Sequence, residues 1–280
     1  MKEVKVGDIL YEKAPPLVRE TDTLAHARNV GIRTRRKTIV VVDDEERPIG
    51  ILDMREIGRK ILDKPNYARP LDRLLVKDFM DKDILTVGEG DYVVDVAKMI
   101  LEKRKEVIVL GKGEEVYGVI EAEDLLGPYS RLSRSETLVR DVYREEPPTA
   151  SPLHSIKYAY ELMEEKGVDA VIVVDQVRRP VGIVTYSDII YLPITSISRG
   201  SRYVKDSKRR VIFVKYSLPV LEDIMSSPVF VASLDELLVD AAGRMYFERI
   251  GHLPVVNEEN MIIGLIDKYI ILEDMVRTGL

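Results

Sequence analysis

Two polar residues three positions apart, Thr185 and Asp188, stand directly after the apolar run Gly182-Ile183-Val184. The β-branched run predicts a strand and the segment that follows predicts a helix, so we expect both residues at the first turn of that helix. Unpaired backbone N–H groups and the positive end of the helix dipole favour a phosphate there. Asp188 could accept hydrogen bonds from ribose hydroxyls, and the Thr185 hydroxyl could bond the neighbouring sugar or phosphate. Both residue types also cap helices, so a purely structural role stays open.

The same sequence frame occurs four times. In each copy a glycine precedes two apolar residues, and a β-rich run stands before the glycine. The four glycines are Gly50, Gly118, Gly182 and Gly264. Their period is roughly 65 residues, with a longer interval before the last, and such a period indicates a repeated structural unit.

Each repeat has the same predicted elements around this frame. A short helix-like turn opens it, and an extended segment and an amphipathic helix follow. The clearest such helix has Ile156, Ala159, Tyr160 and Met163 on one face. Two strands joined by a polar turn and a closing helix complete the repeat. The sequence therefore predicts an α/β unit in which two helices cover a small sheet.

The composition narrows the function classes. A chain of 280 residues suggests about two domains. The net charge of −6 and pI of 5.4 argue against general attraction to nucleic acid or an anionic membrane. The absence of cysteine excludes disulfides, thiol catalysis and cysteine-ligated metal. No apolar run approaches the about 18 residues that span a bilayer, so we expect a cytoplasmic protein. The charged fraction of 32% leans towards a thermophile.

The order of elements, the strand Leu253-Pro254-Val255-Val256 and the Gly-x-x-Thr-x-x-Asp close resemble the cystathionine-β-synthase (CBS) domain. The resemblance implies an α/β (α+β CBS) fold with four tandem βαββα-type repeats, paired into two Bateman modules. This layout is similar to the γ subunit of AMP-activated kinase and is typical of archaeal stand-alone CBS proteins. We expect repeats at 1–70, 71–130, 131–195 and 219–280, a basic connector at 196–218, and modules at 1–130 and 131–280.

The resemblance also implies which residues bind ligand. In the family, the acid that closes the motif binds ribose and the hydroxyl residue before it binds phosphate. The residues at these two positions are Asp53 and Glu56, Glu121 and Asp124, Thr185 and Asp188, and Asp267 and Ile270. Only the third copy matches fully, and Asp124 and Glu56 are secondary ribose candidates. A carboxylate at the hydroxyl position would repel phosphate by about 1 kcal/mol or more.

Further contacts follow from the same resemblance. Backbone groups that flank two strands supply the adenine contacts in the family. Here these candidates are Thr149, Ser151, Val168, Asp169 and Ala170. The phosphate candidates are His252, Arg249 and Arg210. Val168 and Ala170 could equally be ordinary core residues, and a lone histidine such as His252 is more often structural than a ligand.

One stretch departs from the repeat. Residues 193–214 carry six basic residues against the single acid Asp206 and end in an apolar run. One interpretation is a solvated connector that adds an edge strand. The other is an anion-binding flap or partner-docking segment beside the second module, because its charge opposes that of the whole protein.

We therefore expect a regulatory protein that binds an adenine nucleotide (AMP, ADP or ATP) mainly at the third repeat and signals to an unidentified protein partner. One alternative is S-adenosylmethionine or methylthioadenosine, because the acids at positions 53, 121 and 267 would attract a sulfonium cation. Another is a ligand-independent scaffold.

Catalysis is not expected, since His26, His154 and His252 lie in different repeats without metal-ligand spacing. No metal or required cofactor is expected, and neither a membrane nor nucleic acid is an expected partner. A homodimer stays open.

Overall fold

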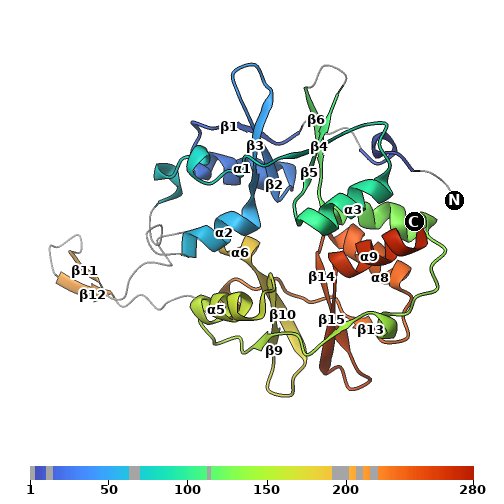
Figure 1. Ribbon diagram of the computed structural model, residues 1–280. Helices are drawn as coiled ribbons and strands as arrows, with labels where there is room; N and C mark the ends of the chain where they lie inside the picture. The colour runs from blue at the N-terminus through green and yellow to red at the C-terminus, as the bar shows by residue number, and fades with distance from the viewer. Residues whose placement is uncertain are drawn as a thin grey trace.

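The computed structural model describes residues 4–10, 15–62, 70–111, 115–190, 202–205, 211–214 and 220–280. Four α/β units form two tiers in Figure 1, with two units in each tier. The hairpin tips point outward from both tiers, and the closing helices meet in the middle. The βαββα order predicted for each repeat is confirmed.

The first two repeats form the upper tier of Figure 1. The first comprises η1 (Val6–Asp8), β1 (Leu17–Arg19), α1 (Leu24–Thr34), β2 (Thr38–Val42), β3 (Pro48–Asp53) and α2 (Met54–Leu62). The second comprises η2 (Leu71–Arg73), η3 (Val76–Asp78), β4 (Leu85–Gly88), α3 (Val93–Lys103), β5 (Val107–Leu110), β6 (Val116–Ile120) and α4 (Ala122–Leu132).

The last two repeats form the lower tier. The third comprises η4 (Val139–Asp141), β7 (Arg144–Glu145), β8 (Thr149–Ala150), α5 (Ile156–Lys166), β9 (Ala170–Val174), β10 (Pro180–Thr185) and α6 (Tyr186–Ile190). The fourth comprises η5 (Leu221–Asp223), β13 (Ala232–Ser233), α8 (Leu238–Glu248), β14 (His252–Val256), β15 (Ile262–Asp267) and α9 (Lys268–Thr278).

The connector between these two repeats contains β11 (Arg202–Lys205) and β12 (Val211–Val214). The two strands pair antiparallel in a sheet of their own. Within the described residues, the connector therefore adds no edge strand to a repeat, which corrects that expectation.

Each repeat has one small mixed sheet. Its first strand runs parallel to the second, and the second and third form an antiparallel hairpin, as in β1-β2-β3. The fourth sheet is extended at its edge by β7, a strand from the third repeat. The third and fourth repeats are thus joined by backbone hydrogen bonds.

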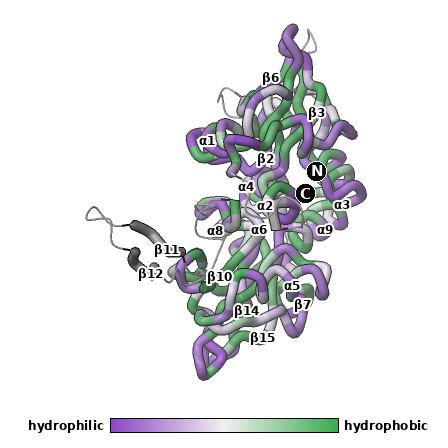
Figure 2. The backbone as a smooth tube through the Cα atoms, turned by 90° about the vertical axis from the view of Figure 1, so that its left-hand side faces the viewer, coloured by the Kyte–Doolittle hydropathy of each residue, from purple (hydrophilic) through white to green (hydrophobic). Residues whose placement is uncertain are grey.

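The two sheets of each tier pack through apolar side chains. In the upper tier Val40 and Val42 belong to one buried cluster with Ile108 and Val119. In the lower tier Ile172 clusters with Ile262 and Leu265. Hydrophobic stretches run through the strands in Figure 2, whereas the hairpin tips are hydrophilic. Burial of these apolar surfaces stabilises each pair of repeats as a module.

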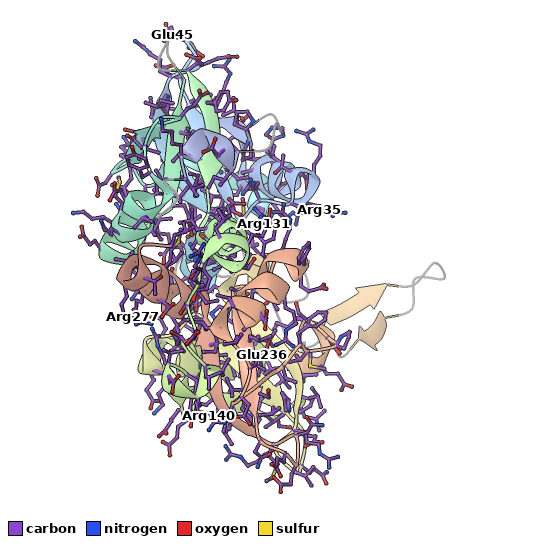
Figure 3. The ribbon with its side chains drawn as sticks, turned by 90° about the vertical axis from the view of Figure 1, so that its right-hand side faces the viewer. Arg35, Glu45, Arg131, Arg140, Glu236 and Arg277 are labelled. Atoms are coloured by element: carbon purple, nitrogen blue, oxygen red, sulfur yellow. The ribbon has the colours of Figure 1, made fainter. Side chains whose placement is uncertain are left out.

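Helices join the two tiers. Contacts pair α2 with α6, α3 with α9, and α4 with α8. Arg131 on α4, labelled in Figure 3, lies over the ring of Tyr246 on α8, with its guanidinium carbon 5.5 Å from the ring centroid. At the α2–α6 crossing, a Cβ added to Gly58 would lie 2.1 Å from the carbonyl oxygen of Tyr186. Only glycine permits this approach.

Candidate functional site

A cleft of about 700 Å³ lies where the four repeats meet. The first repeat contributes Asp53, Arg55, Glu56 and Arg59, and the second contributes Arg104. The third contributes residues 144–148, 163–164, 166–170 and 186, and the fourth contributes His252, Leu265, Asp267 and Tyr269. A ligand of nucleotide size would therefore contact both modules.

The third repeat places its motif residues at a helix start beside this cleft. Helix α6 begins at Tyr186, which lines the cleft. Asp188 Oδ2 accepts hydrogen bonds from Thr185 N at 2.7 Å and from Thr185 Oγ1 at 2.8 Å. Burial raises the pKa of Asp188. The capping contact expected from the residue types is thus formed. Thr185 and Asp188 are not themselves lining residues, and their binding of ribose and phosphate stays a prediction.

Three of the adenine candidates line the cleft, namely Val168, Asp169 and Ala170. They follow Gly167, which ends α5 in a left-handed conformation with φ of 63°. The chain turns there to deliver these residues to the start of β9.

Thr149 and Ser151 do not belong to the lining. Pro147 and Pro148, just before β8, line it instead. Ser151 lies in a local turn, where its backbone N donates to Nδ1 of His154 at 3.1 Å. Contacts of Thr149 and Ser151 with adenine stay a prediction.

His252 is part of the cleft wall and is bonded to the third repeat. Its Nε2 lies 2.6 Å from Oδ1 of Asp169, and the side chain is 9% exposed. Burial alone would raise the pKa of Asp169, but the neighbouring imidazole lowers it. The sequence singled out both residues but did not predict their contact.

Of the other two phosphate candidates, only Arg249 lies within the described residues, and it is not part of the cleft wall. Arg249 is exposed and ends α8 in a left-handed conformation, and it is not a lining residue. Arg210 lies outside the described residues.

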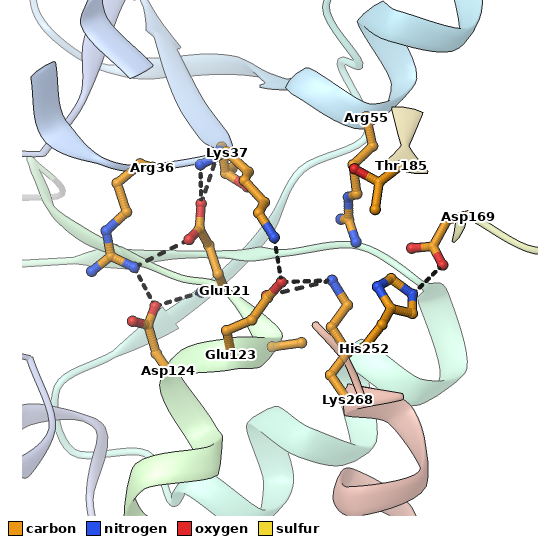
Figure 4. Close-up of polar contacts among 12 residues, drawn as sticks. Arg36, Lys37, Arg55, Glu121, Glu123, Asp124, Asp169, Thr185, His252 and Lys268 are labelled. Carbon is orange, nitrogen blue, oxygen red and sulfur yellow. Dashed lines mark hydrogen bonds and ion pairs between the residues drawn. The ribbon is translucent and has the colours of Figure 1, made fainter. Parts of the chain in front are cut away.

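The second repeat's motif pair is bound to the first repeat, as Figure 4 shows. Glu121 Oε1 accepts hydrogen bonds from the backbone N atoms of Lys37 at 2.7 Å and Thr38 at 2.8 Å. Arg36 forms ion pairs with both Glu121 and Asp124. Burial, together with the nearby carboxylate of Asp124, raises the pKa of Glu121 to about 7. Both motif carboxylates of this repeat are therefore already engaged.

A buried ionic network connects this turn to the fourth repeat. Lys268 Nζ lies 3.3 Å from Glu123 Oε1 and 3.9 Å from Glu106 Oε1. Glu123 also accepts from Lys37 Nζ at 2.9 Å, and Glu106 pairs with Arg55 at 2.8 Å. Burial and Arg55 would lower the pKa of Lys268, but the two carboxylates outweigh them and raise it. The network thus joins residues of the first, second and fourth repeats.

The remaining motif positions also have partners. Asp53 pairs with Arg55 at 2.6 Å, and Glu56 lies 3.6 Å from Arg59. Asp267 accepts the N–H of Ile270 at 2.9 Å and pairs with Arg144 at 3.0 Å.

The lining charges are mixed. The carboxylates are Asp53, Glu56, Glu145, Glu146, Glu164, Asp169 and Asp267. The Arg and Lys side chains are Arg55, Arg59, Arg104, Arg144 and Lys166. Acids thus outnumber these cations by seven to five. The sequence analysis named Asp53 and Glu56 of the first module but missed Arg55, Arg59 and Arg104, because no local motif reports contacts between repeats.

In the described residues, no helix is long and apolar enough to cross a membrane. The same part of the chain contains no group of three or more His, Cys, Asp or Glu side chains arranged to hold a metal ion.

Sequence comparison finds four copies of one family. A family model described as the CBS domain matches residues 6–63, 76–130, 139–194 and 221–277. An uncharacterised protein of Methanopyrus kandleri, MK0525, is 28% identical over 136 residues, which are 48% of this chain and 61% of that protein. A homoserine O-acetyltransferase of Methanohalobium evestigatum is 30% identical over 120 residues, 42% of this chain and 24% of the enzyme. The chain thus spans under two thirds of these relatives' lengths.

Two solved structures share the fold. Protein MJ1225 of Methanocaldococcus jannaschii, described as a candidate archaeal homolog of g-AMPK, gives a TM-score of 0.77 at 19% identity, covering 97% of this chain and all of that one. An uncharacterised conserved protein of Pyrococcus horikoshii gives 0.62 at 20% identity, covering 98% of this chain and all of that one.

Proposed function

Because this chain belongs to the CBS domain family, with four copies that span most of its length, we propose that it is a regulatory ligand-sensing protein. Its ligand is an adenosine compound, with an adenine nucleotide as the leading candidate, bound in the cleft beside the third repeat. Occupancy shifts the equilibrium between arrangements of the repeats and so changes the affinity for a protein partner.

One observation carries the choice of site. The cleft of about 700 Å³ lies beside the motif turn that combines a hydroxyl residue with the closing acid, Thr185 and Asp188. Val168 and the small Ala170 line the same cleft and leave apolar wall for a purine. To bind ribose, Asp188 would exchange its bonds to Thr185 for bonds to the sugar hydroxyls.

The other motif turns support a single principal site. Arg36 and the backbone of Lys37 occupy the carboxylates of Glu121 and Asp124. The fourth repeat has the apolar Ile270 at the position of the ribose acid. A ligand would have to break buried ion pairs in the second repeat, which costs several kcal/mol.

A second candidate ligand is S-adenosylmethionine or methylthioadenosine. The excess of lining carboxylates favours a ligand with a positive or neutral tail over a polyphosphate. Glu145 and Glu146 are exposed lining acids without an ion pair to any described residue, so they could face a sulfonium. Asp53, Glu121 and Asp267, which suggested this ligand from sequence, already have partners.

We propose no catalytic role. The enzyme among the relatives reported above matches this chain over only 24% of its own length. A scaffold without a ligand is the remaining alternative, and the same experiment addresses it.

Isothermal titration calorimetry and thermal shift with AMP, ADP, ATP, S-adenosylmethionine and methylthioadenosine test the proposal. We expect one compound to bind the wild type with a stoichiometry near one and to raise its melting temperature by occupying the folded state. Asp188→Ala should abolish this binding.

Asp124→Ala is the matched control, because Asp124 caps α4 through the N–H of Glu121 at 2.9 Å as Asp188 caps α6. It should lower stability while leaving ligand affinity unchanged. Binding of no compound would favour the scaffold, whereas equal affinity in Asp188→Ala would show that the ligand binds without this motif turn.

A further inference from the structure

Among the described residues, Arg104 differs from the other basic residues of the cleft in having no carboxylate partner. Arg55, Arg59, Arg144 and Lys166 each form an ion pair. Arg104 forms none with any residue in the described ranges, and its side chain is exposed. A guanidinium without a counter-charge on a cleft wall is available to an anion.

The guanidinium of Arg104 stacks on an aromatic ring. The guanidinium carbon of Arg104 lies 4.0 Å from the centroid of the Tyr269 ring, and both residues line the cleft. Stacking on a ring restricts the guanidinium plane and leaves its N–H groups for in-plane bonds to a phosphate or carboxylate. The two residues come from different modules, Arg104 from the second repeat and Tyr269 from the fourth.

The backbone at Arg104 is in a conformation that glycine adopts more readily. Arg104 ends α3 with φ of 55°. Its counterparts at the ends of α1, α5 and α8 are Arg35, Gly167 and Arg249. The third repeat thus shows that glycine fits this position, and a non-glycine residue there is strained.

We propose that Arg104 binds the anionic end of the ligand in this cleft, an inference that rests on the proposed function. The ligand class is then an adenosine compound that carries a phosphate or a carboxylate. Because Arg104 belongs to the first module and Val168 and Ala170 belong to the second, such a ligand bridges the two modules. Its binding strengthens the contact between α3 and α9 and couples occupancy to how the modules sit against each other.

Arg104→Gly tests this directly, because it removes the guanidinium at a position where glycine relieves the strain of the left-handed backbone conformation. The probes are AMP, its uncharged analogue adenosine, and pyrophosphate, titrated by calorimetry. We expect AMP affinity to fall about 10- to 100-fold, as for the loss of charged hydrogen bonds. Adenosine affinity should stay unchanged, and pyrophosphate binding should weaken with AMP binding. Arg35→Gly, the same substitution at the exposed counterpart that ends α1, should change none of the three.

The outcomes separate this inference from the proposed function. If adenosine and AMP bind the wild type equally, the adenosine site stands and the role of Arg104 is overturned. An equal loss of AMP and adenosine binding in Arg104→Gly also overturns it, since the effect is then structural. If no adenosine compound binds but pyrophosphate does, and Arg104→Gly removes that binding, the proposed function fails while the anion site stands. If none of these probes binds the wild type, and neither S-adenosylmethionine nor methylthioadenosine does, both fail.

Discussion

His252 Nε2 lies 2.6 Å from Asp169 Oδ1, which ties the fourth repeat to the third at the wall of the cleft. Both residues occur directly before or at the start of the second strand of a repeat, β14 and β9. The contact therefore joins the third and fourth repeats, which form the lower module, at similar positions of the two repeats. Any ligand that reaches this wall meets a preformed hydrogen-bonded pair rather than a lone imidazole.

This contact predicts an acid sensitivity. The pKa of Asp169 is lower in the folded protein than in the unfolded chain. Its stabilising contribution is thus complete above the unfolded value of 3.8 and is lost as the pH falls below it. Asp169→Asn should lower the free energy of unfolding at pH 6 by about 1–3 kcal/mol. Urea unfolding at pH 6 and at pH 3 should show the difference from wild type shrink at the lower pH. A difference that is constant across this range would contradict the assignment.

Glu121 predicts the opposite pH dependence. Its pKa rises from 4.5 in the unfolded state to about 7 in the folded state. Its contribution is therefore full below pH 4.5 and is lost as the pH rises through 7. Glu121→Gln should remove this slope, which is worth up to about 3 kcal/mol between pH 5 and pH 8. Urea unfolding across that range measures it.

Glu123, two residues further along, is the control for this slope. Lys268 and Lys37 hold its pKa well below its usual range despite burial. Glu123→Gln should therefore lower stability by a similar amount at pH 5 and pH 8. If both variants gave the same pH profile, the separate roles of the two carboxylates would be wrong.

We expect the buried ammonium group of Lys268 to stabilise the buried ionic network that joins the first, second and fourth repeats. It is 1% exposed and lies among Glu123 and Glu106. Lys268→Met would leave these carboxylates without one of their cations and should cost about 3–5 kcal/mol in urea unfolding. Lys98→Met, which breaks an exposed pair with Asp95 on α3, should cost at most about 0.5 kcal/mol. Equal costs would show that the network contributes no more than a surface pair.

Local patterns in the sequence predicted the repeats and the motif turn because both depend on neighbouring residues. Helix α3 ends at Lys103 with Arg104 as its left-handed cap, so no glycine marks this helix end in the sequence. The pairing of β7 with β15 joins residues more than 100 positions apart, and no local period reports it. No local period reports the contacts of Lys37 with Glu123 and of Arg104 with Tyr269 either. Single residues of other repeats, such as Glu56 and His252, could be named from the motif, but the contacts that bring the repeats together around the cleft could not.

A substitution at Gly58 tests whether ligand binding in the cleft depends on the contact of α2 with α6. A Cβ at this position would lie 2.1 Å from the backbone oxygen of Tyr186, the first residue of α6. Gly58→Ala must therefore push α2 away from the turn that carries Thr185 and Asp188. The expected cost is about 1–3 kcal/mol of unfolding free energy. Affinity for the cleft ligand should fall as well, measured by calorimetry on the folded variant.

Gly243→Ala is the matched control because Gly243 lies within α8, where an added Cβ would meet Ser130 at an ordinary 3.6 Å. It should stabilise the protein by about 0.5–1 kcal/mol through helix propensity alone. Its ligand affinity should equal that of the wild type. A Gly58→Ala variant that loses stability but keeps full affinity would show that the cleft tolerates movement of α2. The position of the third-repeat turn would then be set by its own repeat rather than by the first module.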